Sequence, residues 1–242
     1  MTGTRIAAAG RLLLIPVTLG ESMLAAVIPS EVQRCVGSLE YFVAENPKSA
    51  RAYLKQIGTA KPLQDLHIAT LNEHTQDGNI AELAAPILAG HDVGVMSEAG
   101  CPGVADPGAK LVRYAHQHAI RVVPLVGPSS ILLALMASGL NGQNFAFHGY
   151  LPVADVDRER TLRELEKHSR RLNQTQIFIE TPYRNGKLVQ SILGACAGAT
   201  LLCVAVDITL EDEDIRTQSV AAWKKNPPRL DRRPALFLLL AV

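Results

Sequence analysis

The feature that most constrains this chain is a regular alternation of short apolar runs with longer segments of helical periodicity. The apolar runs have the length of buried strands and are expected at residues 11–17, 39–44, 67–71, 92–96 and 121–126. The helical segments lie between them, beginning near residue 30 and spanning residues 47–57, 77–88, 106–118 and 129–137. Such alternation predicts a parallel sheet covered by helices, with ligands gathering at the loops after the carboxyl ends of its strands.

The pattern changes after Asn144. Strands are expected at residues 145–150, 175–179, 200–206, 215–223 and 235–242, with a charged helix at about 157–172 and one further helix at 184–193. So few helices cannot connect all of these strands in parallel, which predicts a mixed sheet. The fold class is therefore α/β, and we expect two α/β domains, residues 1–142 and residues 143–242.

Charge and cysteine usage exclude several classes of protein. Lys and Arg number 24 against 23 Asp and Glu, so a polyanionic partner would need a local basic patch. The four cysteines form no Cys-x-x-Cys pair, so neither a disulfide framework nor a metal site is expected. Arg11 interrupts the apolar start of the chain, and the apolar stretch 234–242 is too short to span a membrane. We expect a cytoplasmic protein without a membrane segment or metal.

Two strand-end loops have unusual compositions. Residues 97–108 contain several glycines and prolines at a strand-to-helix junction, which allows a ligand to approach the backbone closely. The loop is not a P-loop, because Ala109 occupies the lysine position, and no Gly-x-Gly of a Rossmann turn occurs in the chain. In the second loop, residues 126–130, Ser129 and Ser130 stand at a helix start, where they cap the helix or bind a ligand.

In these loops the sequence resembles the tetrapyrrole (corrin/porphyrin) methylase superfamily, and within it the branch of 16S ribosomal RNA cytidine ribose 2′-O-methyltransferases. Five motifs of that branch occur in the same order and at comparable spacing. They are residues 97–108, residues 126–130, Ser138-Gly139-Leu140, Gly149-Tyr150-Leu151-Pro152 and Glu180-Thr181-Pro182-Tyr183-Arg184. The resemblance implies two α/β domains, S-adenosylmethionine held in the cleft between them, a homodimer, and ribosomal RNA or the small ribosomal subunit as partner.

The resemblance also implies which residues contact the cofactor. Carried over by position, these contacts fall on Pro16, Cys101, Val104, Ser129, Ser130, Glu180, Asp207, Ile208 and Pro234. Many of these are backbone contacts. They suit S-adenosylmethionine, because main-chain groups can hydrogen-bond its adenine and its sulfonium cation needs no metal.

Candidate catalytic and substrate residues follow from the proposed chemistry. Methyl transfer to a ribose hydroxyl requires a proton acceptor, for which Glu45 and Asp106 are candidates, although either could be only a cap or an ion-pair partner. Arg158 and Arg184 are candidate contacts to RNA. Other basic positions of the branch pattern are missing: Ala154 replaces a lysine and Tyr183 a histidine, and residues 206–210 lack both of the usual basic residues. These losses remove phosphate contacts.

Three alternatives remain open. A tetrapyrrole or other small-molecule methylase would use the same cofactor. A cofactor-binding protein without turnover would keep the fold alone. A cysteine hydrolase would use Cys101 as its nucleophile, because nucleophiles also occur on tight strand-to-helix turns.

Overall fold

The computed structural model describes residues 9–242 and divides into two compact units. The first unit ends at Pro128 and the second spans Ser129–Val242. The division thus falls before helix α6 (Ser130–Ser138), whereas the sequence predicts a domain boundary near residue 142. The predicted domain limits, residues 1–142 and 143–242, stay a prediction.

The first unit is built on a five-stranded parallel sheet, as the sequence predicts. Its strands, in the order β3-β2-β4-β1-β5, are β1 (Arg11–Ile15), β2 (Tyr41–Ala44), β3 (His67–Thr70), β4 (Val93–Met96) and β5 (Arg121–Pro124). The central strand β4 is fully buried, which explains its continuous apolar sequence.

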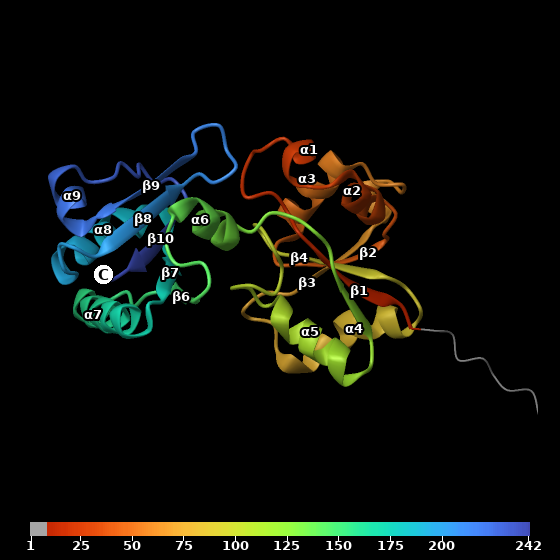
Figure 1. Cartoon of the computed structure of the whole chain (residues 1–242). Helices are drawn as coiled ribbons and strands as arrows, with labels where there is room; N and C mark the ends of the chain where they lie inside the picture. The colour runs from red at the N-terminus through yellow and green to blue at the C-terminus, as the bar shows by residue number, and fades with distance from the viewer. Residues whose placement is uncertain (1–8) are drawn as a thin grey trace, which may run out of the picture. The chain divides into compact units, whose positions relative to one another are not determined.

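Helices cover both faces of this sheet (Figure 1). One face packs against α1 (Leu24–Val27), α2 (Ser30–Gly37) and α3 (Pro47–Ile57), and the other against α4 (Ile80–Leu88) and α5 (Gly108–Gln117). Neighbouring strand residues alternate between the two cores: Leu13 and Phe42 belong to the first, Leu12 and Val43 to the second. Short 3-10 turns at Leu63–Asp65 and Asp77–Asn79 precede β3 and α4.

The second unit contains the mixed sheet that the sequence predicts. Its strands, in the order β6-β7-β10-β8-β9, are β6 (Phe145–Tyr150), β7 (Thr175–Ile179), β8 (Leu201–Val206), β9 (Asp214–Ser219) and β10 (Ala235–Leu240). Only β6 and β7 pair in parallel; the remaining pairs are antiparallel.

The predicted strand at residues 215–223 is wrong in its second half. After β9 the chain turns into helix α9 (Val220–Lys225), because the Ser219 hydroxyl accepts a hydrogen bond from the Ala222 N–H (3.2 Å) and caps the helix. Trp223 is then buried and its indole N–H donates to the Leu202 carbonyl (2.9 Å).

The two faces of the second sheet are covered differently. Helices α7 (Asp155–Leu172), α8 (Asn185–Ala195) and α9 share one core with alternate residues of β7, β8 and β10, including Phe178 and Phe237. Helix α6 lies against the opposite face, where the Thr217 hydroxyl donates to the Ser138 carbonyl (2.7 Å). A 3-10 turn at Pro182–Arg184 links β7 to α8.

Candidate functional site

The loops after β1, β4 and β5 meet at the carboxyl edge of the first sheet. The Val17 N–H donates to the Gly100 carbonyl (2.9 Å), which joins the loop after β1 to the glycine-rich loop after β4. The Cys101 thiol donates to the Pro128 carbonyl (3.4 Å), which joins the same loop to the segment after β5. Loops far apart in the sequence are therefore joined at this edge.

Pro16, a predicted cofactor residue, is held from two sides at this edge. The Tyr53 hydroxyl of α3 donates to its carbonyl (2.8 Å). A Cβ at Gly127 would lie 2.3 Å from the Pro16 ring, so only glycine lets the loop after β5 approach this closely. Pro16 is thus a buried, fixed part of the edge.

Asp106 organises the glycine-rich loop from within. Its carboxylate accepts hydrogen bonds from the N–H groups of Gly103 (2.8 and 2.9 Å) and Gly108 (2.6 Å). Gly103 adopts a left-handed φ of 84°. Ala105 also has a left-handed φ, of 59°, which is uncommon for a residue other than glycine. Burial raises the pKa of Asp106, and the backbone hydrogen bonds act in the opposite direction. The structure therefore gives Asp106 a positioning role.

The predicted catalytic residues Glu45 and Asp106 lie together. Both line a small cavity at the carboxyl ends of β2 and β4, along with Leu71. Glu45 follows β2 directly and is half-buried. Burial raises its pKa, and so do the nearby carboxylates of Glu98, Asp106 and Glu73, while a backbone hydrogen bond from Glu98 lowers it. The pKa of Glu45 thus lies above its ordinary value, and the neighbouring carboxylates give this edge a negative potential.

Cys101 and Val104 occupy different parts of the glycine-rich loop. Val104 is 49% exposed, whereas Cys101 is half-buried. Burial raises the pKa of the Cys101 thiol, which keeps it protonated and argues against the cysteine-hydrolase alternative.

Ser129 and Ser130 begin helix α6 in the second unit. The Ser129 hydroxyl accepts from the Leu132 N–H at 3.5 Å, a long N-cap hydrogen bond. Ser129 is therefore a helix cap, and binding by either hydroxyl remains a prediction.

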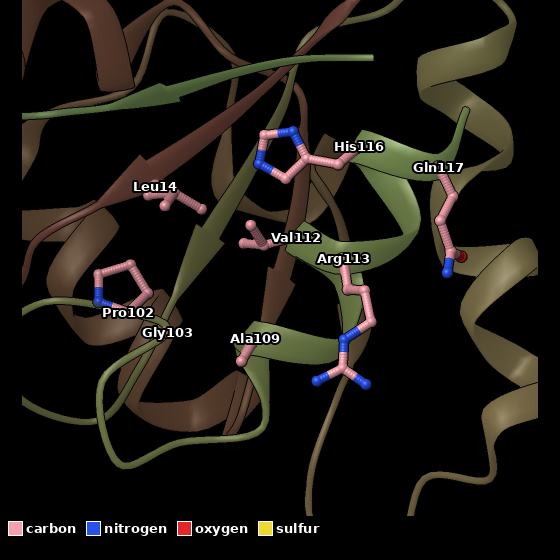
Figure 2. Close-up of a pocket in the computed structure, with 8 residues that line it drawn as sticks. All are labelled: Leu14, Pro102, Gly103, Ala109, Val112, Arg113, His116 and Gln117. Carbon is pink, nitrogen blue, oxygen red and sulfur yellow. The ribbon is translucent and has the colours of Figure 1, made fainter. Parts of the chain in front are cut away.

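A second pocket in the first unit lies beside α5. It has a volume of about 590 Å³ and runs along the helix from Ala109 to Gln117, over Leu14 of β1. Figure 2 shows Arg113 and His116 projecting from the helix at this pocket, with Pro102 and Gly103 of the glycine-rich loop opposite. The loop that Asp106 organises therefore forms part of the wall of this pocket too.

In the second unit, the predicted residues Glu180 and Arg184 form an ion pair in which the carboxylate is buried. Glu180 follows β7 and its side chain is 2% exposed. Its carboxylate accepts from the Arg184 guanidinium at 2.6 and 2.9 Å and from the Thr181 N–H at 2.7 Å. Glu180, a predicted cofactor contact, thus fixes the orientation of Arg184, a predicted substrate contact.

The remaining predicted cofactor residues of this unit gather at the same edge. β10 runs antiparallel to both β7 and β8, so its start lies beside their ends. The Asp207 N–H donates to the Pro234 carbonyl (3.0 Å), the Asp207 carboxylate pairs with Arg233 (2.6 Å), and Ile208 is buried. Glu180, Asp207, Ile208 and Pro234 therefore share one sheet edge.

Two buried polar atoms at this second edge lack a hydrogen-bond partner among residues 9–242. They are Oδ1 of Asn185 and Oγ1 of Thr209. Buried polar groups are normally satisfied, so these two atoms keep unused hydrogen-bonding capacity at this edge.

Arg158, a predicted RNA contact, is buried at the start of α7. Its guanidinium donates to the Ser191 hydroxyl (3.0 Å) and the Val153 carbonyl (2.8 Å), and it pairs with Asp155. These partners bind Arg158 within its own unit, which favours a structural role over contact with RNA.

Most of the basic side chains on α7 are paired with acids of the same helix. Arg160 pairs with Asp157, Arg163 with Glu159, and Lys167 with Glu164. With Arg158 buried as well, the basic side chains outside these ion pairs are Arg170 and Arg171 in the last turn of the helix.

Several residues of these edges were not singled out by the sequence. Tyr53, Glu98, Asn185 and Arg233 act through loops that meet only in the fold. The sequence named both Glu180 and Arg184, and their spacing of four residues after a strand was the available sign that they pair.

The described part of the chain offers neither a metal site nor a membrane-spanning helix. No group of three or more His, Cys, Asp or Glu side chains able to hold a metal ion occurs within residues 9–242. Over the same residues, no helix is long and apolar enough to cross a membrane.

Known proteins resemble this chain in sequence and in fold. A ribosomal RNA small subunit methyltransferase I from Vibrio cholerae serotype O1 is 34% identical over 167 residues, which cover 67% of this chain and 57% of that protein. A protein of the same name from Escherichia coli O157:H7 is 28% identical over 219 residues, covering 89% of this chain and 72% of that protein. The crystal structure of the methyltransferase CobJ has the same fold, with a TM-score of 0.63 at 16% identity, over 97% of this chain and 95% of that one.

The chain spans 57% of the length of the Vibrio cholerae relative, so it corresponds to part of that protein. The family model for Tetrapyrrole (Corrin/Porphyrin) Methylases matches residues 28–222. This match covers most of both units and confirms the expected resemblance: the chain belongs to the tetrapyrrole (corrin/porphyrin) methylase family.

Proposed function

We propose that this protein is an S-adenosylmethionine-dependent methyltransferase that methylates a ribose 2′-hydroxyl in small-subunit ribosomal RNA. Membership of the methylase family and relatives named ribosomal RNA small subunit methyltransferase I support the reaction and the substrate. The single observation that supports it most is the carboxyl edge of the first sheet. There the loop that Asp106 organises, which includes Glu98, lies beside the carboxylate of Glu45.

This edge suits the cofactor in two respects. The carboxylates that raise the pKa of Glu45 create a negative potential, which favours a cationic sulfonium. The left-handed Gly100 and Gly103 carry no Cβ, so a ligand can approach the backbone of the loop. Cys101 and Val104, in this loop, are the cofactor contacts we propose for the first unit, together with Pro16 after β1. Ser129, Ser130, Glu180, Asp207, Ile208 and Pro234 remain predicted contacts.

The proposed mechanism needs orientation and one proton acceptor. When bound, S-adenosylmethionine supplies the methyl group. The fixed loop aligns the acceptor hydroxyl with that methyl, which lowers the barrier chiefly by positioning. Glu45 accepts the hydroxyl proton at its carboxylate, and its raised pKa brings it closer to the range in which a general base is effective. Asp106 holds the loop.

The test is methyl transfer to small ribosomal subunits that lack the modification. We expect a labelled methyl group to appear in the RNA, at a ribose, when wild-type protein and S-adenosylmethionine are present. Glu45→Gln should bind the cofactor and transfer methyl groups far more slowly. Transfer to a tetrapyrrole instead of RNA would establish the small-molecule alternative, which the paired basic residues of α7 favour. We also propose that the protein is cytoplasmic and acts as a homodimer. Light scattering would test the homodimer by measuring the mass of the protein in solution.

A further inference from the structure

Tyr183, Arg184 and Arg232 lie on two loops that are joined at one edge of the second sheet. Tyr183 and Arg184 belong to the turn after β7, and Arg232 lies in the loop before β10. The Asn185 side-chain amide donates to the Arg233 carbonyl (2.8 Å), so residues next to Arg184 and Arg232 are in direct contact. We call these three residues the tyrosine–arginine edge.

Tyr183 is an exposed ring with one face already covered. Its side chain is 70% exposed, and the Arg184 guanidinium lies over the ring, 5.6 Å from its centroid. Arg184 is fixed by the buried Glu180 carboxylate. The cation–π contact and the ion pair together hold the ring in place, which leaves its other face available for stacking.

Arg232 adds a guanidinium group that forms no ion pair within the described chain. It is exposed and has a left-handed φ of 61°, a conformation that glycine adopts at lower cost. Its neighbour Arg233 is bound by Asp207 and fixes the loop. This situation differs from that of α7, where Arg160, Arg163 and Lys167 are each paired with an acid.

We propose that the tyrosine–arginine edge binds single-stranded RNA, with a base stacked on Tyr183 and a phosphate held by Arg232. Proteins recognise unpaired RNA by this combination of an aromatic platform with arginines. The proposal rests on the proposed RNA substrate and names the surface that contacts it. It places the contact at the loops of the second sheet rather than on the basic helix α7.

The experiment measures binding of a fluorescent single-stranded fragment of small-subunit ribosomal RNA to the full chain, at several salt concentrations. Tyr183→Ala should weaken binding about tenfold, as expected for the loss of one stacked base, and Tyr183→Phe should keep most of the affinity. Arg232→Gly suits the left-handed backbone, and it should reduce the slope of log K against log salt by about 1. Arg163→Gln removes a paired arginine from α7 and should bind like wild type.

Calorimetry with S-adenosylhomocysteine on the same variants distinguishes the two ways of failing. If wild type binds RNA and Tyr183→Ala and Arg232→Gly bind it equally well, the tyrosine–arginine edge is wrong and the proposed function stands. If wild type binds S-adenosylhomocysteine but no RNA, the proposed RNA substrate itself fails. Loss of binding to a carboxylated tetrapyrrole in these variants, with RNA binding unchanged, would also overturn the proposal.

Discussion

The Asp106 carboxylate lies 2.6 Å from the backbone nitrogen of Gly108 and also accepts from Gly103, so one side chain closes the glycine-rich loop after β4. Asp106→Ala removes all of these hydrogen bonds. We expect the free energy of unfolding to fall by about 2 kcal/mol, because hydrogen bonds to charged groups contribute more than neutral ones. Urea denaturation measures this change.

The same substitution tests the loop as a cofactor site. Asp106→Ala should weaken binding of S-adenosylhomocysteine, measured by calorimetry, because the loop backbone loses its fixed geometry. Asp106→Asn keeps one acceptor oxygen and should lie between wild type and Asp106→Ala in both measurements. Unchanged affinity of Asp106→Ala for S-adenosylhomocysteine would show that cofactor binding does not depend on the geometry of this loop.

Glu45 should control the pH dependence of methyl transfer. Its raised pKa means that the carboxylate becomes able to accept a proton only as the pH rises through that pKa. The rate constant kcat/KM should therefore rise with pH over this range, and Glu45→Gln should lower it by about 10²-fold or more and remove this limb of the profile. An unaltered profile in Glu45→Gln would exclude Glu45 as the general base.

Glu45 should also affect stability, in the opposite sense to an ion-paired carboxylate. Because its pKa is raised in the folded state, the fold binds this proton more tightly than the unfolded chain does. Stability is thus lost as the pH rises from the ordinary carboxyl pKa through the raised one. We expect Glu45→Gln to have a higher Tm than wild type at pH 8, and the difference to disappear in acid. A lower Tm at pH 8 would show that the ionised carboxylate stabilises the fold.

Arg158 should matter for folding more than for RNA. Arg158→Ala leaves the Ser191 hydroxyl and the Val153 carbonyl without their partner, so we expect a loss of about 2 kcal/mol in the free energy of unfolding. RNA affinity of the folded variant should be unchanged. A stable variant with weakened RNA binding would restore the predicted role of Arg158 in substrate binding.

Gly127 and Gly142 offer a matched pair of glycines. A methyl group at Gly127 would lie 2.3 Å from Pro16, whereas nothing lies within 4 Å of one at Gly142. Gly127→Ala should reduce the free energy of unfolding by about 1–3 kcal/mol through overpacking, and Gly142→Ala should change it little. Equal effects at the two positions would show that the loop after β5 does not depend on close contact with Pro16.

The sequence predicted the sheets well because each strand is encoded locally. The run Val93–Met96 is apolar throughout, as a strand buried on both faces must be, and α3 begins at Pro47 as predicted, where Asn46 accepts from the Lys48 N–H (3.0 Å). The second half of the strand predicted at residues 215–223 is wrong because Val220 and Trp223 are apolar enough for either structure, and the Ser219 cap selects the helix.

The candidate sites were predicted less completely, since they depend on which loops meet. Glu45 was selected at the end of a strand and Asp106 in the glycine-rich loop, and the parallel sheet brings them to one cavity. The burial of Arg158 was not foreseen, because the charge pattern of a helix does not reveal that Ser191 of another helix lies against it. Tyr53 was not predicted for the same reason, because only the fold brings its hydroxyl to the Pro16 carbonyl.

Calorimetric titration of the full chain with S-adenosylhomocysteine tests the central claim most directly. The account predicts saturable binding of one molecule per chain, weakened by Asp106→Ala and left intact by Gly142→Ala. A folded wild-type chain that gives no binding heat, and shows no shift in Tm at high concentrations of the compound, would contradict it.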